Sequence, residues 1–189
     1  MTLAERVPAL AARRPRRADA ARNFDALIAA GRDAFAEEGS SASLEDIARR
    51  AGVGIGTLYR NFPTRDDLID TLYLGEVDAL AQTAHEVADL EPWAALAAWL
   101  DHFVRYVGTK HVLLESLNRP SAVMDQCRTI MFDAGEPLLR RAQSAGVVDP
   151  DITISDVVKL VSGVAAVSSF DDDAQRERVL GLAVNAIRR

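Results

Sequence analysis

The feature that most constrains this chain is a pair of short helical patterns joined by glycine, between residues 43 and 65. Apolar residues fall at i, i+3 and i+4 from Leu44, which gives the first pattern one apolar face. Gly52 stands where the chain must reverse, and glycine accepts a positive φ without steric cost. The second pattern covers residues 54–61. The spacing predicts a helix-turn-helix, whose second helix enters the major groove of DNA. Glycine-linked helix pairs also occur in all-α proteins that bind no DNA.

The residues around this pair resemble the DNA-binding domain of the TetR family of bacterial transcriptional repressors. The match covers roughly residues 20–75, at Ala34, Phe35, Gly39, Leu44, Ile47, Ala48, Ala51, Gly52, Val53, Gly56, Thr57, Leu58, Tyr59, Phe62, Thr64, Arg65 and Leu68. The resemblance implies an all-α fold, with an N-terminal three-helix DNA-binding domain joined by a long helix to a C-terminal helical ligand-binding and dimerisation domain. It also implies a sequence-specific homodimeric regulator, expected to be a repressor that a small apolar effector releases from a palindromic operator.

The polar side of the second helix suggests how DNA is contacted. Tyr59 presents a ring to a sugar or a thymine methyl group, and Arg60 can reach guanine or phosphate. By resemblance, the positions of Thr57, Tyr59 and Arg65 commonly touch DNA, whereas Asn61 replaces a histidine that is frequent in the family. The predicted DNA-contacting residues are Ser43, Gly54, Ile55, Gly56, Thr57, Tyr59, Arg60, Asn61 and Arg65. Two alternatives stay open: Tyr59 could pack in the core, and Arg65 could be a cation on the helix surface.

The net charge of −6 argues against a nucleic-acid partner until the chain is divided. Residues 1–65 hold 11 Arg and 8 Asp+Glu, which gives +3, whereas residues 66–189 hold 11 Lys+Arg and 20 Asp+Glu, which gives −9. The positive part coincides with the predicted helix-turn-helix. Charge asymmetry between the two parts therefore favours DNA binding by the first.

Three regions follow from this pattern. Residues 1–18 are expected to form a flexible basic arm, because Pro8 and Pro15 discourage a continuous helix and several arginines repel one another. The arm could lie on DNA or be a solvated tail. Residues 19–65 are the predicted DNA-binding domain, which includes a first helix from about Asp19 to Glu38. Residues 66–189 are the predicted helical effector-binding and dimerisation domain.

The second part of the chain keeps a helical pattern. A long helix is expected to begin after Pro63, with Thr64 as its cap, and to end near Ala88. The next is expected from Pro92 to about Gly108, where a break is predicted at Gly108–Thr109. Further helices are predicted near 110–117 and 121–145, with a bend at 135–137, and two more cover the remaining residues.

Two surfaces of this part are candidate binding sites. Large apolar side chains with a few polar neighbours indicate an effector pocket formed by Trp99, His102, Phe103, Tyr106, Met124, Cys127 and Met131. A stripe of this kind is more often plain core, and that alternative stays open. The predicted dimer interface consists of Leu160, Val164, Val167, Leu180, Val184 and Ile187. These side chains could instead close the core of the single chain.

No catalytic residue, metal site or cofactor is predicted. The three histidines lie far apart, and His111 with Glu115 is more simply a surface pair. The chain has one cysteine and no signal-peptide core, which predicts a cytoplasmic protein that does not bind a membrane. The expected partners are double-stranded DNA, a second copy of the chain and an unidentified small-molecule effector. The alternative function is a helical protein-binding adapter with a vestigial DNA-binding head.

Overall fold

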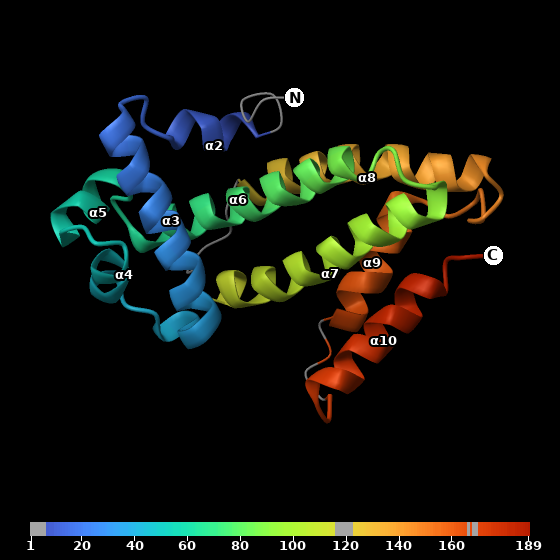
Figure 1. Cartoon of the computed structure of the whole chain (residues 1–189). Helices are drawn as coiled ribbons and strands as arrows, with labels where there is room; N and C mark the ends of the chain where they lie inside the picture. Colours follow the sequence, from blue (N-terminus) through green and yellow to red (C-terminus); the bar gives the residue numbers. More distant parts are fainter. Residues whose placement is uncertain (1–6, 116–122, 166, 168–169) are drawn as a thin grey trace. The chain divides into compact units, whose positions relative to one another are not determined.

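The computed structural model describes residues 7–115, 123–165, 167 and 170–189, with side chains for these except residues 108–115, 123, 124 and 173. In this part of the chain the fold is all-α, as predicted, and no strand is assigned (Figure 1). The helices in chain order are α2 (Pro8–Arg13), α3 (Ala18–Glu38), the short 3-10 helix η1 (Gly39–Ser41), α4 (Leu44–Arg50), α5 (Ile55–Asn61), α6 (Arg65–Glu86), α7 (Pro92–Glu115), α8 (Val123–Ser144), α9 (Ile154–Ala165) and α10 (Asp173–Asn185).

These helices form two compact units. The first unit comprises Met1–Asp78 and Thr109–Cys127, and the second comprises Ala79–Gly108 and Arg128–Arg189. The long helices α6, α7 and α8 each contribute residues to both units. No helix of the described residues is long and apolar enough to cross a bilayer.

The core of the first unit forms where α3 packs against α4 and α5. Helix α3 buries Phe24, Leu27 and Phe35, which are apolar residues at helical spacing. The ring of Phe24 lies 5.3 Å from that of Phe62, the residue that ends α5. The apolar spacing of α3 therefore fixes which face of the helix turns inward.

Residues 7–14 are folded, where a flexible arm was expected. Pro8 occupies the first position of α2, where its missing N–H costs no hydrogen bond. Val7 and Leu10 are buried, and the guanidinium of Arg13 donates to the Asp67 carbonyl at 2.9 Å and to Thr71 Oγ1 at 2.6 Å. These contacts with the first turns of α6 offset the repulsion between neighbouring arginines that suggested a flexible segment.

Helix α7 passes through Gly108 and Thr109, so the break predicted there is wrong. A glycine inside a helix costs only about 1 kcal/mol relative to alanine, which the surrounding helical residues can offset. The second predicted break, at residues 118–120, lies outside the described residues. Helix α8 likewise continues through Pro137.

The second unit has an aromatic core along α7. The rings of Trp99 and Phe103 stack with centroids 5.8 Å apart, and Phe103 is the same distance from Tyr106. Gly135 of α8 leaves room for the indole: a Cβ built there would lie 2.5 Å from Trp99 Cη2 and 2.9 Å from Ile154 Cδ1. The backbone of α8 thus approaches α7 at the one position without a side chain.

Short polar contacts fix the ends of the last helices. The Thr153 hydroxyl and the Asp156 carboxylate form a capping box at the start of α9, and Asp172 caps α10 by accepting from Gln175 N at 2.6 Å. After α10, Arg189 N donates to the Val147 carbonyl at 2.9 Å, which ties this segment to the loop before α9.

Candidate nucleic-acid interface

The turn between α4 and α5 has the predicted geometry. Ser43 Oγ accepts from Asp46 N at 3.3 Å and so caps α4. Gly52 has φ +69°, the left-handed conformation that the reversal requires. The turn is closed by a hydrogen bond of 3.0 Å from Val53 N to the Ala48 carbonyl. Two short helices are thereby joined rigidly enough to act as one unit.

Charged side chains join α4 to α3. Arg50 bonds Glu37 at 2.6 Å, Glu38 at 2.7 Å and also Asp46. Hydrogen bonds from Arg50 and Arg49 hold the pKa of Asp46 below its ordinary value, because they favour the charged carboxylate. Hydrogen bonds to Glu37 and Asp46 raise the pKa of Arg50, because they favour its charged form. The charged carboxylate of Asp46 is therefore bonded to both Arg49 and Arg50.

Helix α5 presents a mixed polar and apolar face to solvent. Leu58 is fully buried, whereas Tyr59 is 46% exposed and Ile55 is 38% exposed. Arg60 is also exposed, and its side chain has no hydrogen bond or ion pair within the described residues. A tyrosine and an arginine with this exposure do not serve the core, so the core-packing alternative for Tyr59 is set aside.

The remaining predicted contacts on α5 differ in how they are held. Gly54 and Gly56 are exposed, and a Cβ at either would meet no atom within 4 Å. Thr57 is half-buried, and Asn61 donates through Nδ2 to the Thr57 carbonyl at 2.8 Å. The Ser43 hydroxyl is engaged by its cap and by Glu45 Oε2 at 3.0 Å.

Arg65 is placed differently from the other predicted contacts. Its guanidinium donates to the carbonyls of Ala42 and Ser40, the latter at 2.8 Å, and its Cζ lies 4.8 Å from the centre of the Phe35 ring. Arg65 thereby ties the first residue of α6 to the segment before α4. The sequence could not reveal this role, because the accepting groups are backbone carbonyls more than twenty residues away.

Comparison with known proteins matches both parts of the chain. Residues 27–72 match the family described as "Bacterial regulatory proteins, tetR family", and residues 91–189 match "Transcriptional regulator SbtR-like, C-terminal domain". The TetR transcriptional regulator SCO0520 from Streptomyces coelicolor is 39% identical, with a TM-score of 0.72 over 87% of this chain and 97% of that one.

The chain belongs to the TetR family. It is thus a DNA-binding transcriptional regulator, and regulators of this family are not enzymes. A TetR transcription regulatory protein from Mycobacterium vanbaalenii is 29% identical, with a TM-score of 0.71 over 93% of this chain and 100% of that one. SmeT, the repressor of the Stenotrophomonas maltophilia multidrug efflux pump SmeDEF, shares the fold at 18% identity, with a TM-score of 0.56 over 87% of this chain and 90% of that one.

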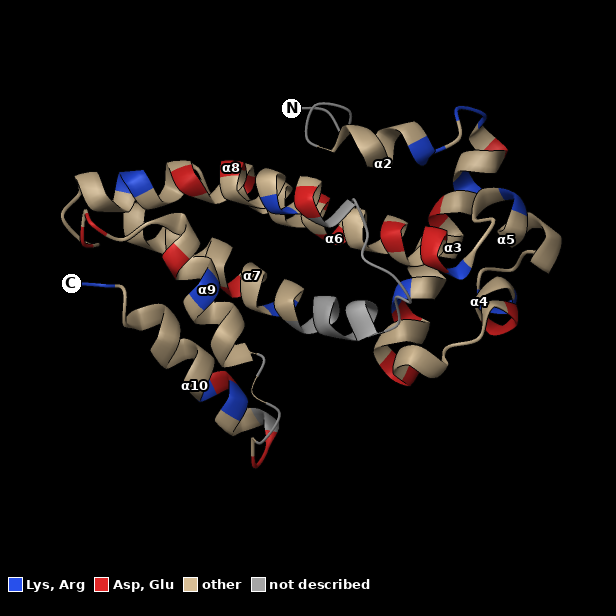
Figure 2. Ribbon diagram, turned by 180° about the vertical axis from the view of Figure 1, so that it is seen from behind, with Lys and Arg blue, Asp and Glu red and all other residues tan. Residues whose placement is uncertain are grey.

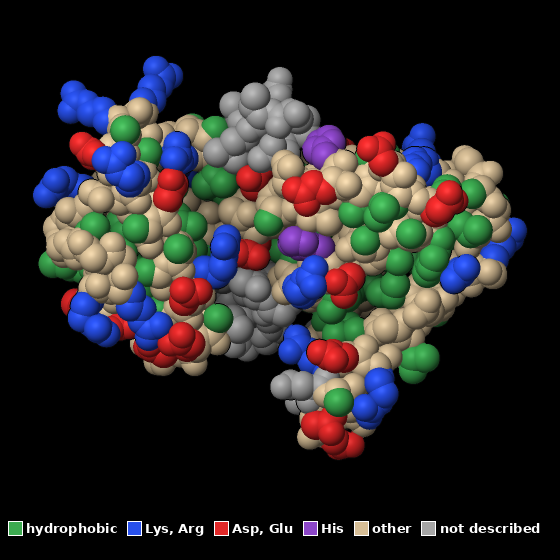
Figure 3. All heavy atoms as spheres, in the orientation of Figure 1, with side chains coloured by type: hydrophobic (Ala, Val, Ile, Leu, Met, Phe, Trp, Pro, Cys, Tyr) green, Lys and Arg blue, Asp and Glu red, His purple; other side chains and the backbone are tan. Residues whose placement is uncertain are grey.

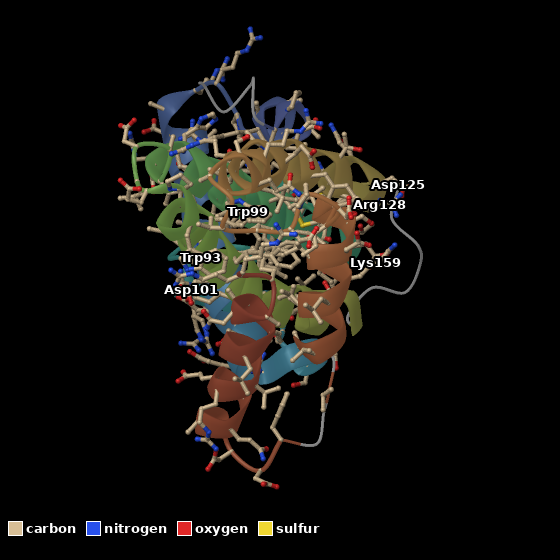
Figure 4. All side chains as sticks on the ribbon, turned by 90° about the vertical axis from the view of Figure 1, so that its right-hand side faces the viewer. Trp93, Trp99, Asp101, Asp125, Arg128 and Lys159 are labelled. Carbon is tan, nitrogen blue, oxygen red and sulfur yellow. The ribbon has the colours of Figure 1, made fainter. Side chains whose placement is uncertain are left out.

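In this TetR-family chain the predicted effector-pocket residues are mostly packed into the interior. Trp99, Phe103, Tyr106, Cys127 and Met131 are buried. Figure 4 shows Trp99 among the helices and Asp101 toward their edge. The side chain of Met124 lies outside the described residues.

Two polar groups lie among these side chains, the indole nitrogen of Trp99 and the imidazole of His102. Within the described residues, the buried indole nitrogen Nε1 of Trp99 has no hydrogen-bond partner. His102 Nδ1 lies 2.9 Å from Thr83 Oγ1, which also donates to the Ala79 carbonyl at 3.0 Å. A buried donor without an acceptor is uncommon in native proteins.

A groove that the sequence did not predict lies between α7 and α10. Its volume is about 470 Å³, and its lining comes from Ala97, Asp101, Val104, Arg105, Glu177, Leu180, Gly181, Val184 and Asn185. Asp101 and Arg105, one turn apart on α7, form an ion pair of 3.0 Å along one wall of this groove. The α7 residues of this groove lie on the opposite side of the helix from Trp99 and Phe103, so the two regions are separate.

The predicted dimer residues divide into two groups. Leu160 of α9 is 40% exposed and Val167 is 45% exposed, whereas Val164 and Val184 are half-buried. Leu180 and Ile187 are buried by the chain itself, so these two serve the core of the single chain. Leu182, which the sequence did not single out, is the most exposed large apolar side chain of α10, at 69%. No cluster of three metal-binding side chains occurs among the residues described.

Proposed function

We propose that this chain is a homodimeric repressor, which binds a near-palindromic operator and is released by a small effector. Residues 19–65 form the DNA-binding domain in this proposal, and residues 66–189 bind the effector and the second copy. The observation that carries the proposal is the exposed face of α5, where Tyr59 and Arg60 point away from the core beside the solvent-facing Gly56.

On this proposal, α5 lies in the major groove and each part of its face has a role. Tyr59 packs its ring on a sugar or thymine methyl and its hydroxyl reaches a phosphate, while Arg60 contacts guanine or phosphate. The bare Gly54 and Gly56 allow the backbone to approach DNA closely. Two α5 helices related by a twofold axis meet half-sites about one helical turn apart, which requires a palindromic operator.

The dimer is proposed to form through the exposed apolar side chains of α9 and α10. Leu160, Val167 and Leu182 remain in contact with solvent in the single chain. Gly163 of α9, which lies between Leu160 and Val167 in sequence, has no atom within 4 Å of a built Cβ, so a second helix could approach closely there. Apolar side chains and small residues on two helices are typical of four-helix interfaces.

The effector is proposed to combine an apolar body with a hydrogen-bond acceptor. Trp99, Phe103 and Met131 supply the apolar lining, and Trp99 Nε1 is a donor that lacks an acceptor within the described residues. A carbonyl or carboxylate oxygen of the ligand would satisfy that donor. This refines the expectation of a purely apolar ligand.

Selection of bound duplexes from a random pool tests DNA recognition. The proposal predicts recovery of a palindrome with a fixed half-site spacing. On the recovered duplex, Tyr59→Ala should weaken binding at least about tenfold, because a contact of this kind contributes about 1–3 kcal/mol in each half-site. Tyr59→Phe keeps the ring and should lose less. Recovery of no preferred sequence would contradict the proposed repressor function.

Release by an effector has its own test. A ligand found by thermal shift should weaken operator binding by the same factor by which the operator weakens ligand binding, because the two couplings are reciprocal. Trp99→Phe removes the indole N–H and keeps an aromatic side chain. It should reduce affinity for a ligand that carries an acceptor oxygen more than for its hydrocarbon analogue. Equal losses for both ligands would refute the acceptor contact.

A further inference from the structure

Arg16 and Arg17 are basic side chains that the helix-turn-helix does not use. Both are exposed, and within the described residues neither side chain has a hydrogen bond or an ion pair. The other described arginines up to Arg65 bond a carboxylate or a carbonyl, with the exception of Arg60. Figure 2 shows this basic connection between α2 and α3. Figure 3 shows Lys and Arg side chains extending into solvent above it.

The connection that carries Arg16 and Arg17 is held on both sides. Before it, α2 is fixed by the buried Val7 and Leu10 and by the bonds from Arg13 to Asp67 and Thr71. Within it, Arg14 makes two bonds to Asp25 of α3, at 2.8 and 2.5 Å. The acidic partner is thus used by Arg14, and the next two arginines keep their charge at a defined position.

The same connection lies at the end of α3 that packs against α5. Arg17 is the N-cap of α3, and Phe24, about 10 Å further along the helix at 1.5 Å per residue, contacts Phe62 at the end of α5. Arg60 lies two residues before Phe62. The unpaired guanidinium groups of Arg16, Arg17 and Arg60 therefore belong to one end of the DNA-binding unit, although Arg60 is more than forty residues from the other two in sequence.

We propose that Arg16 and Arg17 bind phosphates of the DNA backbone beside the half-site that α5 contacts. This inference rests on the proposed function, because it needs an operator bound by α5. Phosphate is the favoured partner because guanidinium groups bind it in forked geometry. A connection fixed at both ends lacks the free length with which disordered arms enter the minor groove. Because α2 is folded, Arg16 and Arg17 are held in position before DNA binds.

The test uses Arg16→Ala/Arg17→Ala in the full chain, with Arg140→Ala/Arg178→Ala as the control of equal charge. The control residues are exposed side chains of the second unit. Binding to the selected operator is measured between 50 and 200 mM salt. Each lost phosphate contact lowers the slope of log K against log salt by about 0.9, so four contacts per dimer lower it by about 3.6. The ratio of the wild-type affinity to that of the double variant should therefore fall about a hundredfold between 50 and 200 mM salt.

Base preference separates this proposal from minor-groove contact. Phosphates carry no sequence information, so the double variant should keep the wild-type preference at every operator position. Leu10→Ala, which loosens α2 and removes no charge, should weaken binding at each salt concentration. A salt slope equal to that of the control, a changed preference at flanking base pairs, or full affinity in Leu10→Ala would overturn the inference. If the wild type selects no operator at all, the proposed function itself fails, which is a distinct result.

Discussion

Replacing Arg65 shows whether its side chain contacts DNA or instead stabilises the DNA-binding unit. Its guanidinium donates to two backbone carbonyls, those of Ser40 and Ala42, and lies against the ring of Phe35. Arg65→Ala removes both hydrogen bonds and the cation–π contact. Each hydrogen bond contributes about 1 kcal/mol net. The cation–π contact at a partly exposed site adds about 0.5 kcal/mol.

These contributions give a loss of about 2 kcal/mol in the free energy of unfolding once partial solvent exposure is allowed for. For a chain of this size, that loss lowers the Tm by about 4–8 °C. Arg65→Lys keeps the charge but cannot donate in a fork to two carbonyls, so it should lose about half as much. Operator affinity should fall because α4 and α5 are held less firmly, while the salt slope of binding stays unchanged.

Thermal unfolding followed by circular dichroism, with operator titrations at several salt concentrations, measures both quantities. Arg60→Ala is the matched control, because Arg60 is exposed and unpaired within the described residues. It should leave the Tm within about 1 °C, as surface substitutions do, and should weaken DNA binding. An Arg65→Ala variant with the wild-type Tm and a shallower salt slope would refute the stabilising role of Arg65 and identify a phosphate contact.

Three further results are expected. Gly135→Ala forces a Cβ against Trp99 and should destabilise the chain by about 1–3 kcal/mol in denaturant titrations, whereas Gly181→Ala, which meets no atom within 4 Å, should not. Leu160→Glu should give a monomer in sedimentation experiments, and Lys159→Glu a dimer; a dimeric Leu160→Glu would exclude the α9 face. Because the pKa of Asp46 is lowered in the folded state, its stabilising effect is present above about pH 4 and lost as pH falls further. Asp46→Asn should flatten that acid dependence, and an unchanged profile would contradict it.

Much of the fold was predictable because local signals and tertiary packing agree. The first helix was expected from Asp19 to Glu38 and spans Ala18–Glu38, since its apolar stripe at 3.6-residue spacing is the stripe that is buried. Gly52 adopts the predicted positive φ because no other residue type takes that turn as readily. Short-range patterns of this kind carry their own physical cause within a few residues.

The parts that escaped prediction depend on partners distant in sequence. Nothing near Leu10 indicates that it will be buried or that Arg13 will find Thr71, more than fifty residues away. Leu180 has the same apolar character as Leu160, and only packing decides that one is buried and the other exposed. The groove beside Asp101 was missed for a related reason, because its two walls come from helices far apart in the chain.

The contact between Thr83 and His102 fixes the tautomer of the imidazole. A threonine hydroxyl has one hydrogen, and Thr83 directs it to the Ala79 carbonyl, so its oxygen must accept from Nδ1–H of the ring. The lone pair of the neutral imidazole then resides on Nε2. The imidazole of α7 is thereby linked through one hydroxyl to the backbone of α6, so a single side chain joins two helices that are separate along the chain.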